Sequence, residues 1–332
     1  MKHKLFLVAF TFLLTIIPLK AYSNVSMPGY WNVGTARNLS PISKNADVSI
    51  QMKNELIKVA IYRGFAVVKG EYIMYNHSSK NINLELGYPE NGLFLNKEVQ
   101  NVIFNDLDNL KVFINDAEIK TNKIKNDSST NNKVRSWYVW KNKFLAKKET
   151  KIVVYYLLDT HYAKIKKGYS SGDGDAFAYI IESGKVWKNN IEKGLVYISL
   201  QDNLNEKDII GFLPFDRLKY SNSDNSIIYS FTDLKPDKEN NIILRYQASP
   251  DSFNFDKIKR ESQDYYNFLD QIIPNQNMSD YKIMEKKDFS VADYSTYFLL
   301  AFLAILIFLT IFLINILRLL IRLFKRNIKK KN

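Results

Sequence analysis

The sequence predicts a mainly β protein with two β-sandwich-like units, a juxtamembrane amphipathic helix and one C-terminal transmembrane helix. Three observations lead to this fold class. Short segments of alternating apolar residues recur between turn signals from residue 48 to residue 247. Apolar residues at helical spacing follow them. An uncharged run of 21 residues then begins at Tyr297.

Residues 1–23 have the pattern of a signal peptide. A basic start precedes an apolar core of 13 residues, Leu5 to Ile17, and Pro18 ends that core. Ala21 and Ser23 are small residues at the two positions that a signal peptidase reads, so we expect cleavage after Ser23. The alternative is an uncleaved anchor, which would give the chain two spans with both ends inside.

Residues 24–160 are predicted to form the first β-sandwich domain. Apolar and polar residues alternate along its segments, and turn residues such as Arg63-Gly64 and Asn91-Gly92 separate them. Thr121 to Lys133, which is rich in Asn, Lys, Ser and Thr, is expected to be a surface loop. Strands are expected at 48–52, 57–61, 66–75, 82–88, 110–114, 134–140 and 151–158.

Residues 161–250 are predicted to form a second β domain, and an amphipathic helix is predicted at 251–274. Strands are expected at 177–182, 194–200, 226–232 and 241–247. Phe255, Ile258 and Leu269 then recur at helical spacing among charged neighbours. This helix either packs under the last β domain or forms a stalk, and residues 275–296 form a linker.

A transmembrane helix is predicted at Tyr297 to Leu317. These 21 residues have no charge. A helix of that length is about 31 Å long, close to the hydrocarbon thickness of a bilayer. The basic tail 318–332 contains no acid, so the positive-inside rule places it in the cytoplasm and residues 24–296 outside.

The basic tail allows two interpretations. It is a helix that lies against anionic headgroups, with each cation worth about 1 kcal/mol near the surface, or it is a plain stop-transfer sequence. In the first interpretation, the lipid contacts are five cations on one helix face: Arg318, Arg322, Lys325, Arg326 and Lys329.

The net charge of +13 is mostly a consequence of topology. Removing the +3 of the leader and the +7 of the tail leaves only +3 on residues 24–296. We therefore predict no nucleic-acid partner. The chain contains no cysteine, so the exported domain has no disulfide and no thiolate ligand, which favours a bacterial source.

Four stretches have a recognisable pattern: "ELIKVAIYRGFAVVKGEYIMYNHSSKNINLELGYPENG", "WYVWKNKFLAKKETKIVVYYLLD", "YIIESGKVWKNNIEKGLVYISLQ" and "FTDLKPDKENNIILRYQ". They resemble a family of bacterial exported proteins of unknown function. The opening is also similar, less closely, to the β-sandwich module of the vault and inter-alpha-trypsin type. The matching positions shape turns and fill cores, so the resemblance implies a β fold and no catalytic residue. The matching positions are Tyr88, Pro89, Gly184, Trp187 and Pro236.

Candidate catalytic residues are few. After the leader there are two histidines, His77 and His161, and no HExxH or GxSxG motif. We therefore assign no catalytic residue and predict that the protein is not an enzyme. An envelope enzyme is the least favoured class, and it would require a pocket with convergent polar groups around His161.

The stretch Ser170 to Asp175 is the candidate metal site. Asp173 and Asp175 offer hard oxygen ligands in a glycine-rich segment that we expect to be a flexible loop, which is chemistry that calcium uses. The favoured alternative is a solvated connection between strands. We therefore predict no cofactor, with calcium as the one alternative that these two carboxylates leave open.

Trp137 and Trp140 are the candidate contact residues for a ligand or partner. They are three positions apart in a predicted strand, so their side chains should point to opposite faces of the sheet. An exposed tryptophan could stack on a sugar or anchor a protein partner, whereas a contact between the two β units would cover it.

These features predict a membrane-anchored, extracytoplasmic β-sandwich protein, periplasmic or on the cell surface. Its expected role is non-catalytic: it would hold an envelope protein or another envelope component near the membrane. A glycan- or calcium-binding surface module is the alternative. The expected partners are membrane lipids, through the C-terminal helix and tail, and an envelope protein or glycan.

Overall fold

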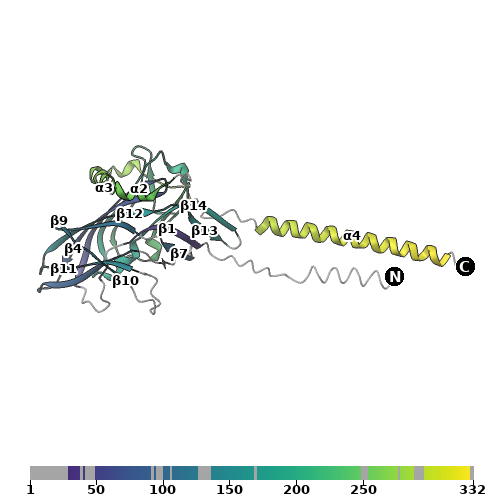
Figure 1. Cartoon of the computed structure of the whole chain (residues 1–332), viewed down its shortest axis with the longest axis horizontal. Helices are drawn as coiled ribbons and strands as arrows, with labels where there is room; N and C mark the ends of the chain where they lie inside the picture. The colour runs from purple at the N-terminus through teal and green to yellow at the C-terminus, as the bar shows by residue number, and fades with distance from the viewer. Residues whose placement is uncertain are drawn as a thin grey trace.

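The computed structural model describes residues 29–37, 40–41, 49–90, 93–94, 100–104, 107–125, 136–167, 170–247, 253–275, 277–287 and 295–329. The expected signal peptide, residues 1–23, lies outside this part of the chain. The predicted mainly β fold with one C-terminal apolar helix is confirmed (Figure 1). The expected loop at 121–133 is wrong in part, because Asn122–Lys125 form strand β10, which pairs with β11 (Ser136–Phe144).

The largest sheet contains strands from both predicted β units. Its order is β20-β17-β18-β15-β3-β4-β12-β8-β9. β15 pairs in parallel with β3, and Val196 lies opposite Ile57. The boundary predicted at Thr160 comes directly after β12, and the sheet continues across it. The strands are β3 (Ile50–Tyr62), β4 (Phe65–Asn76), β8 (Leu107–Ile114), β9 (Ala117–Ile119), β12 (Glu149–Asp159), β15 (Ile191–Leu200), β17 (Lys219–Ser221), β18 (Ser226–Leu234) and β20 (Lys282–Ile283).

Two smaller sheets complete the β body. One has the order β16-β19-β14-β13-β1-β7-β6, and the other has the order β10-β11-β5-β2. Their remaining strands are β1 (Gly29–Arg37), β2 (Ser40–Pro41), β5 (Ile82–Pro89), β6 (Leu93–Phe94), β7 (Gln100–Phe104), β13 (Ala163–Lys167), β14 (Ser170–Ile180), β16 (Ile209–Leu213) and β19 (Ile242–Tyr246). Short 3₁₀ helices connect several strands: η1 (Ile181–Val186), η2 (Glu206–Asp208), η3 (Lys238–Asn240) and η4 (Met278–Asp280).

The main core lies between the three sheets. Ile57, Val59 and Ile61 alternate along β3 and are fully buried there with residues of β5, β14 and β19. Ala60 points to the other face of the same strand and is also fully buried. Because the middle of β3 is covered on both faces, its sequence is a nearly continuous apolar run.

A polar network crosses the main core and links all three sheets. The Tyr179 hydroxyl of β14 donates to the Glu55 carboxylate of β3, which is 2% exposed. The hydroxyls of Tyr88 (β5) and Tyr156 (β12) lie 2.8 Å apart. Burial raises the pKa of Tyr156 and of Tyr179 well above the ordinary value, so both hydroxyls keep their protons.

Helices α2 (Phe255–Arg260) and α3 (Ser262–Gln271) cover the outer face of the large sheet (Figure 1). The buried side chains of Tyr266 and Leu269 pack against Phe65 and Leu157 of β4 and β12. The amphipathic segment is thus no stalk. It lies mainly on strands of the first predicted β unit rather than under the second.

Helix α4 (Ser295–Lys329) extends away from the β body (Figure 1). Leu300–Leu323 within it is long and apolar enough to cross a membrane, and none of it is buried in the protein. The predicted span, 297–317, lies within α4. A single unburied apolar helix of this length is what a membrane anchor requires.

Candidate functional site

Residues 277–287, between α3 and α4, are docked on the β body. β20 pairs with β17, and the backbone N–H of Met284 donates to the carbonyl of Leu218 at 3.1 Å. Lys287 Nζ then donates to the carbonyl oxygens of Glu206 and Ile209, at 2.7 and 3.0 Å. The surface around Glu206 is therefore tied to the chain shortly before α4.

The length of chain between this contact and α4 limits where the surface can lie. Eight residue steps separate Lys287 from Ser295, and a fully extended chain covers at most about 28 Å in that number of steps. The carbonyl of Glu206 is bonded to the Lys287 side chain. This surface is therefore held near the start of the apolar helix, and we call it the tether surface.

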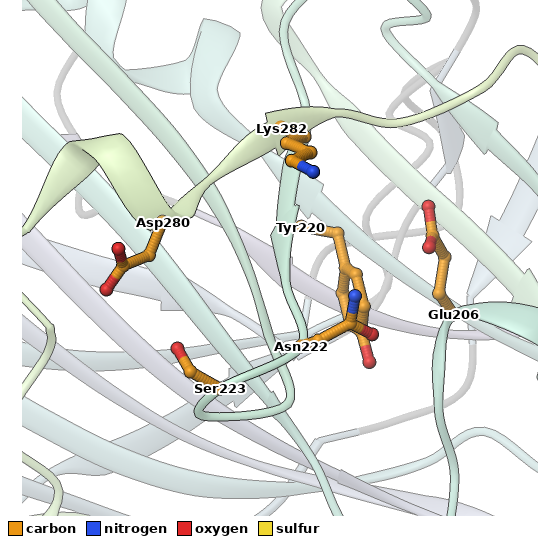
Figure 2. Close-up of a pocket in the computed structure, with 6 residues that line it drawn as sticks. All are labelled: Glu206, Tyr220, Asn222, Ser223, Asp280 and Lys282. Carbon is orange, nitrogen blue, oxygen red and sulfur yellow. The ribbon is translucent and has the colours of Figure 1, made fainter.

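A pocket of about 280 Å³ opens at the tether surface (Figure 2). Its walls come from segments far apart in the sequence: η2, β17, the turn after β17, η4 and β20. Tyr220 and Lys282 are directly opposite each other in the β17–β20 pair, so their side chains share one face. The lining residues are Glu206, Tyr220, Asn222, Ser223, Asp280 and Lys282.

The charged side chains of the pocket differ in whether they already have a hydrogen-bond or ion-pair partner. The Asp280 carboxylate accepts hydrogen bonds from the side-chain amides of Asn277 and Asn275, at 3.1 and 3.4 Å. Among the described residues, neither the Glu206 carboxylate nor the Lys282 ammonium has an ion-pair or side-chain hydrogen-bond partner. Two opposite charges therefore line one hollow without neutralising each other.

Tyr220 forms a fixed wall of the pocket. Its hydroxyl donates to Asn225 Oδ1 at 2.8 Å, and Asn225 Nδ2 donates to the carbonyls of Leu200 and Leu204, at 2.9 and 2.7 Å. Burial raises the pKa of Tyr220, so this wall is a neutral phenol. The exposed side chains of Asn222 and Ser223 complete the rim.

Asp224 stabilises the turn behind the pocket. Its Oδ2 accepts hydrogen bonds from the hydroxyls of Tyr197 and Tyr281, at 3.0 and 2.9 Å. Burial raises the pKa of Tyr197 to about 12, which keeps its hydroxyl a donor. Since Tyr281 directly precedes β20, these bonds fix the strand that bears Lys282.

A second polar cluster joins two residues that the sequence selected separately. His161 Nδ1 lies 3.5 Å from Asp175 Oδ1, and the Asp175 side chain is fully buried. The backbone N–H of His161 donates to Asp159 Oδ1 at 2.9 Å, and the His161 ring centroid is 4.9 Å from that of Phe253. A buried carboxylate beside a histidine orients its ring, as in acid–base sites.

The predicted calcium site is not in a loop. Asp173 and Asp175 lie in strand β14, which pairs with β13, and Lys164 is opposite Asp173. Asp175 faces the protein interior, toward His161, while the Asp173 side chain lies outside the described residues. In the described part of the chain, no group of three or more histidine, aspartate or glutamate side chains is arranged to hold a metal ion. Calcium binding stays a prediction.

The two candidate tryptophans lie on β11, as the strand period predicts. Trp140 is buried in the main core at 3% exposure, and Trp137 is half-buried. Trp137 is opposite Pro89 of β5 on one side and Ile124 of β10 on the other. Trp140 thus fills the core, and a ligand or partner contact at Trp137 stays a prediction.

The basic residues after the predicted span continue in helix α4. Arg318 and Arg322 are exposed in the structure, whereas the side chains of Lys325, Arg326 and Lys329 lie outside the described residues. Their predicted contact with anionic lipid is not tested by the structure.

The sequence did not reveal the pocket residues. β17 and β20 have three and two residues, too short to show a period, and their pairing joins positions about 60 residues apart. A signal was present in Ser221 to Asn225, where polar residues capable of forming a turn follow Tyr220, but it does not identify the partner segment.

No protein-family model matches the chain, and no curated protein matches it. A protein of Legionella pneumophila that is described as a putative nutrient binding protein is 14% identical with a TM-score of 0.46, over 78% of this chain and 96% of that protein.

Two enzymes are similar over smaller shares of their length. An M1 zinc metallopeptidase of Deinococcus radiodurans is 5% identical with a TM-score of 0.30, over 60% of this chain and 43% of that protein. Yeast LTA4 hydrolase is 6% identical with a TM-score of 0.32, over 63% of this chain and 32% of that protein. The chain thus spans less than half of these enzymes. Similarities of this extent identify neither a ligand nor a reaction for it.

Proposed function

We propose that this protein is a single-pass membrane protein whose β body, on the extracytoplasmic side, binds an envelope component close to the bilayer. Helix α4 is the observation that supports this function: its 24-residue segment Leu300–Leu323 is apolar enough to cross a membrane and has no cover from the protein. Exposing such a surface to water is unfavourable, at about 25 cal/mol per Å². The basic residues that follow favour a cytoplasmic C-terminus.

Binding close to the membrane is supported by the tether surface. Lys287, the last described residue before α4, is bonded to η2, which forms one wall of the pocket. A ligand in that pocket would therefore be held near the membrane. The pocket is polar and small, which suits recognition of a soluble or headgroup-sized molecule rather than a lipid tail.

Anchoring and orientation can be tested with single cysteines, because the chain has none of its own. We expect the full chain to stay in membranes after a carbonate wash and a chain ending at Lys287 to be released. In intact cells, an impermeant maleimide should label Glu118→Cys on the β body but not Lys331→Cys. Release of the full chain, or labelling of the tail alone, would refute the proposal.

A second candidate function is an envelope hydrolase that uses His161 as a general base. The short distance from Nδ1 to the buried Asp175 carboxylate favours it. Turnover of ester or glycoside substrates that His161→Asn abolishes and His77→Asn preserves would establish this activity. Equal turnover by both variants would eliminate it.

A further inference from the structure

We propose that the pocket between Glu206 and Lys282 binds a small zwitterion, an aminoalkyl phosphate, with its ammonium at Glu206 and its phosphate at Lys282. The inference rests on the proposed function, because it gives the ligand class for the binding site at the tether surface. The ligand is either a lipid headgroup in the adjacent bilayer or the same chemical group on a free molecule.

The charges of the pocket are the first argument. Elsewhere on the β body, opposite charges that lie close together form pairs, such as Lys53 with Glu149 at 3.0 Å and Lys69 with Glu71 at 2.9 Å. Glu206 and Lys282 line the same hollow, yet neither pairs with the other or with a further charge among the described residues. A ligand with one charge of each sign would satisfy both at once.

The remaining lining groups are the second argument. Asp280 adds a negative charge but is already bonded to two asparagine amides, so Glu206 is the carboxylate left for an ammonium. The Asn222 amide, which also lines the hollow, can donate to a phosphate oxygen, whereas the Ser223 hydroxyl already shares a hydrogen bond with the Ser221 hydroxyl at 2.8 Å. Figure 2 shows the Lys282 ammonium and the Glu206 carboxylate on different walls of the hollow, with Tyr220 and Asn222 below them in this view.

Preorganisation is the third argument. The wall that bears Lys282 is fixed by the β17–β20 pair and by the Tyr281 bond to Asp224. The wall that bears Glu206 is fixed by the two bonds from Lys287 to the carbonyls of Glu206 and Ile209. The backbone at Glu206 and at Lys282 is thus held by contacts of other residues. Ligand binding therefore does not need to order these segments.

Location selects phosphate as the anionic end. Lys287, which is bonded to the wall that bears Glu206, is at most about 28 Å of extended chain from the start of α4, so the pocket is held near the headgroup layer. Headgroups that combine an ammonium with a phosphate are concentrated at that layer. A primary ammonium, unlike a quaternary one, can donate hydrogen bonds to Glu206.

The test is calorimetric titration of the full chain in detergent micelles with ethanolamine phosphate. We expect saturable binding, with ethanolamine, inorganic phosphate and choline phosphate each about tenfold or more weaker. Glu206→Gln and Lys282→Gln should each weaken binding about tenfold or more, because each removes one charge-assisted contact. Glu118→Gln and Lys120→Gln, exposed charges on and beside β9, are the matched controls and should bind like the wild type.

Three results would overturn the proposal: binding no tighter than that of the separate halves, binding unchanged in both pocket variants, or tighter binding of β-alanine, which has a carboxylate in place of phosphate. Unchanged melting temperatures of the variants exclude misfolding as the cause of any loss.

In bilayer discs, weaker binding of free ethanolamine phosphate when the lipid is phosphatidylethanolamine than when it is phosphatidylcholine identifies a headgroup as the natural ligand. Equal binding in the two lipids identifies a free molecule. Anchoring is measured separately by carbonate extraction, so failure of either proposal is distinguishable from failure of the other.

Discussion

Individual residues around His161 link stability to pH. Asp159 lies at the end of β12 and accepts a hydrogen bond from the backbone N–H of His161. Burial raises the pKa of its carboxyl, although the bond from His161 opposes this shift. A raised folded-state pKa contributes stability that is complete below the unfolded pKa and is lost as pH rises through the folded pKa.

Asp159→Asn should therefore stabilise the protein at neutral pH. The amide oxygen can still accept from the His161 N–H, and the buried charge is gone. We expect a higher melting temperature than the wild type at pH 7 and a difference that shrinks toward zero as pH falls to about 4. Glu118→Gln, at an exposed site, is the control and should change stability by less than about 0.5 kcal/mol. A difference that grows on acidification would contradict this account.

At the scale of single residues, the sequence correctly predicted which faces of a strand some side chains lie on. The two-residue period of β11 correctly separated a buried Trp140 from a half-buried Trp137. The sequence could not predict the contact between His161 and Asp175, because that contact depends on the β13–β14 pairing. It also could not find Glu206 and Lys282, whose proximity is set by tertiary structure alone.

Among the secondary-structure elements, helices α2 and α3 show what the spacing of apolar residues can and cannot predict. The helical pattern was predicted over 251–274, and the structure has two helices with Glu261 between them. Of the predicted apolar face, Leu269 is buried and Phe255 and Ile258 are partly buried in the same cluster, while Tyr266, which the pattern did not include, is also buried. The surface that receives this face was not predictable, because Phe65 and Leu157 belong to strands about 110 to 200 residues earlier.

Removing the central apolar contact of α3 should lower the stability of helices α2 and α3 more than that of the large sheet. Leu269 is fully buried, and Leu269→Ala is expected to cost about 2–5 kcal/mol. Hydrogen exchange should quicken at the amides of α2 and α3 while those of β3 and β15 stay protected, because strand pairing does not depend on Leu269. Asn267→Ala, on the exposed face of α3, is the control. Equal loss of protection in β15 would show instead that helices and sheet unfold together.

At the scale of the whole molecule, the large sheet joins both halves of the chain. Eight residue pairs connect β3 and β15 in parallel, and the Glu55 to Tyr179 bond ties β3 to a second sheet. We therefore expect the β body to unfold in one transition, with equal calorimetric and van't Hoff enthalpies. Two resolved transitions, with β12 and β15 losing protection at different temperatures, would show that the two predicted units are independent.

The class of the whole molecule was predictable because local patterns determine it. Alternation along β4, β12 and β15 predicted strands near their observed bounds, whereas the two strands expected at 48–52 and 57–61 are one continuous strand, β3. Hydropathy alone predicted the apolar segment of α4. Sheet membership was not predictable: the parallel β3–β15 pair and the β17–β20 pair join positions that no local pattern relates.

The β3–β15 pair also determines when the protein can finish folding. Asn54 is opposite Lys193, 139 residues later in synthesis. At about 5–20 residues per second, β15 emerges roughly 7–28 s after β3. Until then β3 and β4 can pair, but the outer edge of β3, with its long apolar run, is an open template for other chains. A newly made chain therefore passes through an aggregation-prone interval, and a holding chaperone that covers residues 50–62 during those seconds would raise the yield of folded protein.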